Sequence, residues 1–480
     1  MLPRIFHTLC LWLTTLAVTA AEPFELRGYY ITFMRMPVMG LPEWKRAVDC
    51  FAEDEINTLV LWMPGGFRSR KFPITWRYNE EHANVRQDFA QELIDYAHTR
   101  KIRVLLGFTP FGYDGINQFP LEQPELKAKK ADGSAVDEFG IHCWGWSLCP
   151  AQPESQRLMR EYLREMIVDF YPNADGLLIE SSDYNVCQCS QCGARHYDHE
   201  FGLVRWVSDE MWKVNPKATI LVYPHYFTGK KVPGFDVHGA KQPFDPRWGL
   251  FFTPHSAHFD EDLIRRAQTT VFSGPEAVLG TPQTIAASAQ SARKHGVRGF
   301  LPSLEAFSYV PSHSEGGEKY VVGKRMRPFG LNSEREGKMP FGGLLPRVQR
   351  FAVREFSQNP DLTFAEFVPR LQKHVFGADE PKENVRNLLS LQQIWTQDAD
   401  WYWSSPLLDP DLFRERAHRQ KWSRDKLRHY DENLARLREI SLRYAKSAQS
   451  NELEMNRLAE EVFQRWGNRK PSEVGGNLPR

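Results

Sequence analysis

The most constraining feature of this chain is a regular alternation of short apolar segments with amphipathic ones between about residues 24 and 305. The short segments are rich in Val, Ile and Leu, as expected of strands covered on both faces. The segments between them repeat apolar residues at steps of three and four, which predicts helices. Eight such alternations favour an α/β fold of the (β/α)8 TIM barrel type over an open doubly wound sheet. The open sheet is also disfavoured because no Gly-x-Gly-x-x-Gly fingerprint follows the first strand.

The expected strands cover residues 26–33, 58–63, 103–108, 176–180, 219–223, 249–253, 278–281 (with 270–272 as the rival for this seventh strand) and 298–304. The expected helices between them cover residues 42–53, 88–100, 155–170, 194–214, 260–267 and 284–295.

The sequence pattern changes in the second part of the chain, because no strand pattern is found from Leu345 onward. A capping box at Thr363–Glu366 predicts the start of a helix. An apolar stripe over 427–444 predicts a long amphipathic helix, and 452–466 predicts a last helix against it. We therefore expect four units: a signal peptide (1–21), the barrel (22–344), an all-helical C-terminal region (345–466) and a flexible tail (467–480).

The first residues are typical of a secretory signal. Arg4 precedes an apolar core over 9–18, and small residues follow at Ala20 and Ala21. We expect a secreted or periplasmic protein and no membrane insertion, since no later stretch is apolar for long enough to span a bilayer. Without the signal, the chain has 60 basic and 60 acidic residues, and this charge balance argues against nucleic acid as a partner. An aromatic fraction of 13%, with 14 tryptophans, suits a protein that binds sugars.

Candidate catalytic carboxylates follow two of the expected strands. In the fourth strand, alternation places Gly176, Leu178 and Glu180 on one face, with Glu180 at the carboxyl end, where such barrels build their active sites. Glu305 follows the eighth strand in the same way, and Asp183 lies three residues after Glu180. Two carboxylates from separate strands provide the acid and the nucleophile or base of glycoside hydrolysis. We expect Glu180 as the proton donor, Glu305 as its partner and Asp183 in an assisting role.

Other strand ends and nearby loops offer side chains for substrate binding. Indoles and phenols stack on sugar rings, and a histidine can bind a hydroxyl. The candidates are Trp62, Trp144, Tyr223, His225, His255 and Tyr309.

A cysteine cluster lies just beyond the fourth strand. Cys187, Cys189 and Cys192 have the spacing of zinc ligands, and Cys149, Cys143 or His196 would complete a tetrahedron. In an exported protein disulfides compete with zinc, and the sequence leaves both open. In either case we expect the cluster to fix the loop that carries Asp183. We expect no cofactor for catalysis, because thiolate-rich metal sites are structural.

Several motifs over about residues 25–377 together resemble a known group of proteins. They are the opening Glu25–Thr32, the segment Ser147–Glu154, the run Tyr171–Gly176 and the Cys-x-Cys-x-x-Cys cluster. The chain resembles exported glycoside-hydrolase barrels of the hexosaminidase and α-glucuronidase type. The resemblance implies glycosidic chemistry, with Glu180 at the acid/base position.

One departure from that group concerns mechanism. Hexosaminidases present adjacent Asp and Glu at this strand end, whereas Ser181 and Ser182 separate Glu180 from Asp183 here. The departure argues against the substrate-assisted mechanism of hexosaminidases.

The sequence therefore favours an exported glycoside hydrolase that acts on a poly- or oligosaccharide. One alternative is a non-catalytic carbohydrate-binding barrel protein. Another is a metal-dependent hydrolase or deacetylase built on His225, His255 and His258. The sugar, the linkage and the oligomeric state stay open.

Overall fold

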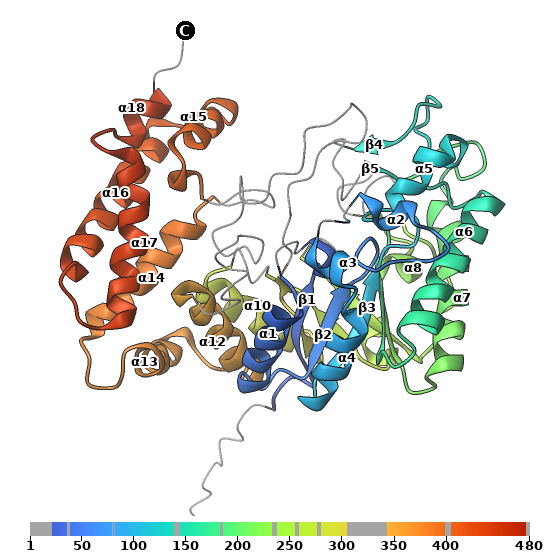
Figure 1. Ribbon diagram of the computed structural model, residues 1–480, viewed down its shortest axis with the longest axis horizontal. Helices are drawn as coiled ribbons and strands as arrows, with labels where there is room; N and C mark the ends of the chain where they lie inside the picture. The colour runs from blue at the N-terminus through green and yellow to red at the C-terminus, as the bar shows by residue number, and fades with distance from the viewer. Residues whose placement is uncertain are drawn as a thin grey trace, which may run out of the picture.

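Eight parallel strands close into a barrel in the computed structural model of the chain (Figure 1). The structure describes residues 22–35, 39–78, 80, 82–138, 145–182, 186–232, 238–254, 259–275, 280–304, 343–398 and 405–476. The strands are β1 (Leu26–Ile31), β2 (Thr58–Trp62), β3 (Arg103–Phe108), β6 (Gly176–Ile179), β7 (Thr219–Val222), β8 (Trp248–Phe252), β9 (Thr270–Phe272) and a last strand in two pieces, β10 (Gly299–Phe300) and β11 (Ser303–Leu304).

The barrel closes through β1, which pairs with β2 on one side and with β10 and β11 on the other. All of these pairings are parallel, as a chain of strand–helix repeats requires. The (β/α)8 prediction is confirmed, and seven of the eight strands lie within two residues of their expected bounds.

The seventh strand is the one that the sequence misplaced. Thr270–Phe272 forms β9 and pairs with β8 and β10, so the rival prediction holds the seventh strand position; residues 278 and 279 lie outside the described residues. Thr281 instead caps the next helix, accepting a hydrogen bond from the Thr284 amide. A strand of three residues is too short to show a period of its own, and this explains the error.

Close approach between strands fixes the register of β6. A Cβ atom on Gly176 would lie 1.8 Å from the carbonyl oxygen of Thr219 in β7, so no side chain fits at this position. At the same end of β6 the Asp175 carboxylate accepts a hydrogen bond from the Val104 amide (2.8 Å). These contacts align the strand so that Glu180 follows its carboxyl end.

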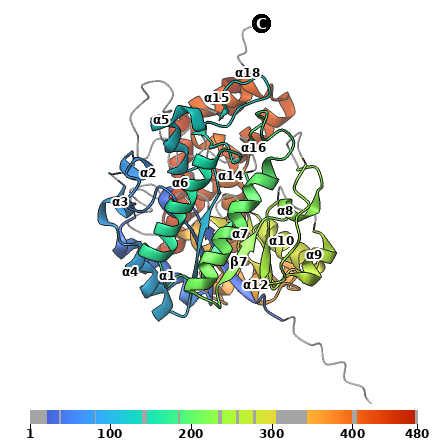
Figure 2. The same ribbon diagram turned by 90° about the vertical axis from the view of Figure 1, so that its right-hand side faces the viewer.

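Helices surround the barrel in the expected order (Figures 1 and 2). They are α1 (Leu41–Glu53), α4 (Ala90–Thr99), α6 (Pro153–Arg164) with a π-helical extension (Glu165–Phe170), α7 (His196–Val214), the single turn α8 (His225–Thr228), α9 (Glu261–Arg266) and α10 (Pro282–Lys294). Smaller elements within the connections are η1 (Phe33–Arg35), α2 (Ile74–Arg77), α3 (Ala83–Gln87), η2 (Ile116–Gln118), α5 (Phe119–Glu122), η3 (Pro124–Leu126), β4 (Asp137–Glu138) and β5 (Gly145–Trp146).

The helix α12 (Leu344–Gln358) takes the eighth position around the barrel, although the sequence analysis assigned it to the C-terminal region. It packs against α10, and its Arg350 forms an ion pair with Asp54 at the end of α1 (2.6 Å). The Gln349 side chain also donates to the carbonyl oxygen of Gly280 (2.7 Å). These contacts attach α12 to the barrel helices α1 and α10.

The remaining elements form the helical C-terminal region, seen at the left of Figure 1. They are α13 (Phe364–Val375), α14 (Lys382–Thr396), η5 (Pro406–Leu408), α15 (Pro410–Arg419), α16 (Arg424–Tyr444), α17 (Ser450–Trp466) and α18 (Pro471–Gly476). The capping box is present, since Thr363 accepts from the Glu366 amide. The long helix α16 packs against α17 as its apolar stripe predicts.

Within the expected flexible tail, Pro471–Gly476 forms α18, which packs on α15 and α16 and thus differs from the expectation. Among the described residues, none of the helices combines the length and the apolar character needed to cross a membrane.

Candidate active site at the barrel mouth

Glu180 lies at the carboxyl end of the fourth barrel strand, immediately after Ile179 in β6. Its side chain is buried, with 7% of the residue exposed. The backbone amide of Glu180 donates to the carbonyl oxygen of Phe108 in β3 (3.0 Å), so the sheet pairing continues to this residue. The carboxylate is therefore held by the rigid strand and not by a loop.

The carboxylate of Glu180 has polar partners from both neighbouring strand ends. The hydroxyl of Tyr223, which follows β7, donates to Oε1 (3.0 Å). The hydroxyl of Thr109, which follows β3, lies 3.4 Å from Oε2. A buried carboxylate requires such partners, because burial without them is costly. They also fix the direction in which its oxygens point.

Aromatic rings line the barrel next to Glu180. The Tyr223 ring stacks on Phe251 of β8 (centroids 5.8 Å apart), and Phe251 meets Tyr30 of β1 (6.0 Å). Since β1 and β8 are not neighbours in the sheet, the contact between Tyr30 and Phe251 spans the barrel interior. Tyr30 in turn meets Trp62 at the end of β2 edge-on (6.1 Å). An aromatic arc of Tyr30, Trp62, Tyr223 and Phe251 thus borders the carboxylate.

Trp62 brings to this arc a polar atom that forms no hydrogen bond with any residue that the structure describes. Its indole Nε1–H is buried and has no hydrogen-bond partner among the described residues. Buried donors in proteins are almost always paired, and an unpaired one at a strand end is a candidate contact for a ligand. The ring also meets Tyr113 edge-on (6.0 Å) from the loop that follows β3.

His225 lies beside Tyr223 at the start of α8, with ring centroids 5.7 Å apart. Its Nδ1 lies 2.7 Å from the hydroxyl of Ser181, while its Nε2 is buried and has no partner within the described part of the chain. Burial lowers the pKa of His225 to about 4. The imidazole is therefore neutral near pH 7 and suited to hydrogen bonding more than to carrying charge.

A buried polar network supports the segment after β6 from behind. The Tyr226 hydroxyl donates to Glu200 Oε1 of α7 (2.6 Å) and lies 3.0 Å from the carbonyl oxygen of Glu180. Glu200 also accepts from the Ser182 amide (3.1 Å), and Tyr197 donates to the Ser182 carbonyl oxygen (2.5 Å). Burial and the neighbouring Glu200 carboxylate raise the pKa of Tyr226 well above its ordinary value, so it stays a donor.

The structure brings together part of the set of site residues that the sequence predicted. Glu180, Trp62, Tyr223 and His225 lie at one end of the barrel, as expected. The other candidates, namely Asp183, Glu305, Trp144, His255, His258 and Tyr309, lie outside the described residues, and their roles stay predictions. Leu304, directly before Glu305, ends β11 beside Ile31.

Sequence reasoning pointed to the strand end 108–111 but not to Thr109 as a partner of Glu180, and it missed Tyr30 and Phe251. Thr109 is the first polar residue after the apolar strand β3, so its position was a usable signal. Tyr30 and Phe251 lie inside continuously buried strands, where nothing in the sequence separates residues facing the barrel interior from residues facing the helices.

The described residues that can hold a metal ion are the four thiols of Cys149, Cys187, Cys189 and Cys192, whose Sγ atoms all lie within 4.8 Å of one another. Of the fourth ligands that the sequence left open, Cys149 lies in the cluster and Cys143 lies outside the described residues. His196 instead accepts a hydrogen bond from the Cys187 amide (3.1 Å).

No family model matches the chain, and no curated protein matches it. Among solved structures it is similar to a GH138 enzyme targeting pectin rhamnogalacturonan II, with a TM-score of 0.46 and 13% identity over 95% of this chain and 57% of that chain. It is also similar to a β-N-acetylhexosaminidase from Bacteroides fragilis, with a TM-score of 0.48 and 13% identity over 74% of this chain and 70% of that chain. For the Flavobacterium johnsoniae chitobiase the TM-score is 0.44, with 12% identity over 92% of this chain and 71% of that chain. The fold described above follows from the strand pairing of this chain itself.

Proposed function

We propose that the protein is a glycoside hydrolase in which Glu180 protonates the leaving oxygen of a poly- or oligosaccharide. The proposal rests on the placement of the Glu180 carboxylate. It follows the fourth barrel strand, accepts a hydrogen bond from Tyr223 and lies beside the aromatic arc. Proton transfer from a positioned carboxylic acid to a glycosidic oxygen needs a group held in this way. The aromatic arc supplies flat apolar faces for a sugar ring.

Each described residue has a separate part in the proposed reaction. Glu180 carries the proton, and the hydroxyls of Tyr223 and Thr109 orient its two oxygens. The indole N–H of Trp62, which has no partner among the described residues, binds a sugar oxygen. Glu305, which follows the last barrel strand, is proposed as the nucleophile or base, and the separation of the two carboxylates sets retention or inversion.

The leader-like residues 1–21 support export from the cytoplasm as part of the proposal.

The test is the release of reducing ends from a panel of polysaccharides and aryl glycosides by the wild type and by Glu180→Gln. We expect the variant to lose about three orders of magnitude of turnover, within the 10²–10⁴ range that a positioned acid or base typically contributes. The matched control is Glu25→Gln, the same exchange at an exposed residue just before β1, at the opposite end of the barrel.

The control variant should keep wild-type turnover. If Glu180→Gln folds as the wild type does and keeps full activity, Glu180 is not the acid. If the wild type binds glycans but releases no reducing ends on the whole panel, and Glu180→Gln binds equally well, the protein is a carbohydrate-binding barrel instead.

A further inference from the structure

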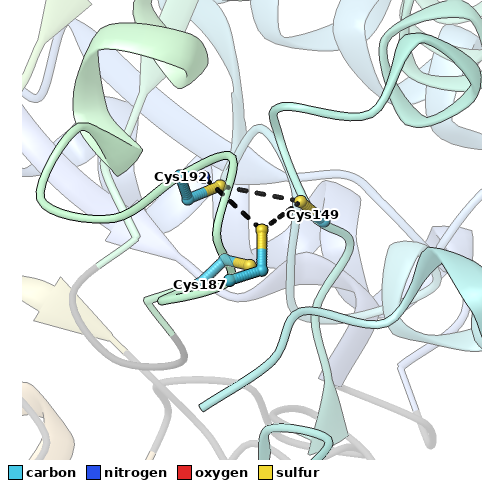
Figure 3. A group of neighbouring side chains, drawn as sticks. Cys149, Cys187 and Cys192 are labelled. Carbon is cyan, nitrogen blue, oxygen red and sulfur yellow. Dashed lines mark hydrogen bonds between the residues drawn. The ribbon is translucent and has the colours of Figure 1, made fainter. Parts of the chain in front are cut away.

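Four cysteine thiols from two separate loops converge on one point (Figure 3). Cys149 precedes α6, and Cys187, Cys189 and Cys192 lie between β6 and α7. The Sγ atom of Cys149 lies 3.7 Å from that of Cys189 and 3.6 Å from that of Cys192. In a tetrahedral zinc site with Zn–S bonds of about 2.3 Å, the sulfur atoms lie about 3.8 Å apart. The two distances from Cys149 match an edge of such a tetrahedron, and all four sulfur atoms lie within 4.8 Å of one another.

The same spacing differs from that of paired disulfides. A disulfide brings one pair of sulfurs to about 2.05 Å and leaves the others apart. Here Cys149 is almost equally far from two different partners, and all four cysteines are free thiols.

Backbone amides point at the sulfur atoms as they do around thiolate ligands. The Lys129 amide donates to Sγ of Cys187 (3.3 Å), and the Cys192 amide donates to Sγ of Cys189 (3.4 Å). Such donors around the ligands spread the negative charge that thiolates carry when they bind a metal ion, and they fix ligand orientation. A purely apolar packing of cysteines would not need them.

Among the described residues, the apolar packing around the thiols is small. Besides cysteines, the part of this cluster that the structure describes has Ala128 and Val136 as buried members and Ala151 as a partly buried one, and it is separate from the main core. Small apolar cores of this kind usually depend on a metal ion or a covalent cross-link. The segments that meet here are the turn that includes Ala128 and Val136, the residues before α6, and the loop after β6.

The cluster is also connected to the candidate active site. The Cys187 amide donates to Nδ1 of His196, which places the ring proton on Nε2, 3.0 Å from Oε2 of Glu200. Through its other oxygen, Glu200 accepts from Tyr226, whose hydroxyl lies 3.0 Å from the carbonyl oxygen of Glu180. Close buried contacts therefore connect the Cys187 backbone to Glu180 through His196, Glu200 and Tyr226, and the contact between His196 and Glu200 is a close approach and not a hydrogen bond.

We propose that Cys149, Cys187, Cys189 and Cys192 bind one Zn²⁺ ion. Four thiolates fill the coordination shell of zinc, so the ion is structural and holds the loop after β6 against the residues before α6. By holding Cys187, it positions His196 and Glu200 behind Glu180. The site does not depend on the proposed glycosidase activity, since it is defined by the thiols alone.

The test begins with the metal content of the full chain purified without chelators, and with its thiols counted after denaturation without reductant. We expect one zinc ion per chain and all four cluster cysteines alkylated as free thiols. Cys189→Ser, which changes the partly exposed ligand, should lose most of the zinc. Cys50→Ser is the matched control, because Cys50 lies in α1 and is partly buried outside the cluster, and it should keep the ion.

A second measurement covers the case in which Cys189→Ser does not fold. The wild-type protein, with its zinc exchanged for Co²⁺, should show the intense visible absorption of tetrahedral thiolate-bound cobalt. Disulfide-linked peptides among the four cysteines, or a reduced protein that takes up neither Zn²⁺ nor Co²⁺ stoichiometrically, would overturn the proposal. Loss of zinc from Cys50→Ser but not from Cys189→Ser would overturn it as well.

Discussion

At the end of β7, one phenol links the carboxylate of Glu180 to the aromatic arc. The Tyr223 hydroxyl donates to Glu180, while its ring stacks on Phe251 with an interplanar angle of 10°. Two functions thus reside in one side chain, and substitution can separate them. The hydroxyl sets the direction of the carboxylate, and the ring keeps the barrel mouth packed.

We predict that Tyr223→Phe lowers kcat/KM about 10- to 100-fold and leaves the fold intact. Hydrogen bonds to charged groups contribute about 1.5–3 kcal/mol, and the phenylalanine ring preserves the stacking on Phe251. Kinetics on the best substrate found, together with thermal unfolding, measure both effects. Unchanged kinetics would show that the hydroxyl does not orient the reacting carboxyl group.

At the scale of elements, α12 closes the ring of barrel helices through a nearly buried ion pair. Nε of Arg350 lies 2.6 Å from Oδ2 of Asp54, and their side chains are 12% and 10% exposed. In contrast, Arg354 on the same helix is 34% exposed and lies 3.9 Å from the exposed Glu55. The two arginines therefore form a matched pair for measuring how α12 is attached.

We predict that Arg350→Met lowers the free energy of unfolding by about 3–5 kcal/mol, because it leaves the Asp54 carboxylate buried without its partner. Arg354→Met should cost at most about 1 kcal/mol, as is usual for exposed pairs. Urea unfolding followed by circular dichroism measures both variants. Equal costs for the two would mean that the Arg350–Asp54 pair does not hold α12 to the barrel.

The strands also show which elements a sequence can reveal. Glu180 and Trp62 could be predicted because each stands at the carboxyl end of an apolar run in a chain with barrel periodicity. The seventh strand was placed wrongly, since its three residues are specified by pairing with β8 and β10 and not by any local pattern. The sequence also could not show that α12 packs on the barrel, because the amphipathic pattern of a helix does not say which surface the helix covers.

For the whole molecule, two buried histidines couple stability to pH. Burial lowers the pKa of both His82 and His225 from 6.5 to about 4. Between these values the unfolded chain binds more protons than the folded one. The contribution of these two histidines to the free energy of unfolding is therefore largest above pH 6.5 and falls as the pH drops toward 4, by about 3 kcal/mol for each histidine.

We predict that the variant His82→Asn/His225→Asn, whatever its stability at pH 7, shows a flatter dependence of unfolding free energy on pH between about 4 and 6.5. The control is His418→Asn, at an exposed residue of α15, which should keep the wild-type slope. Urea unfolding at several pH values provides the comparison. If the double variant keeps the wild-type slope, other groups cause the acid sensitivity.

The central claim is that Glu180 gives a proton to the leaving oxygen. It is tested most directly by how the loss of activity in Glu180→Gln depends on the leaving group. The measurement is kcat/KM of the wild type and of Glu180→Gln on aryl glycosides whose leaving phenols differ in acidity. Acidic phenols depart without protonation, so the variant should be nearly as fast as the wild type on them and slower by about 10²–10⁴ on the least acidic ones. A loss that is the same for every leaving group would contradict the account.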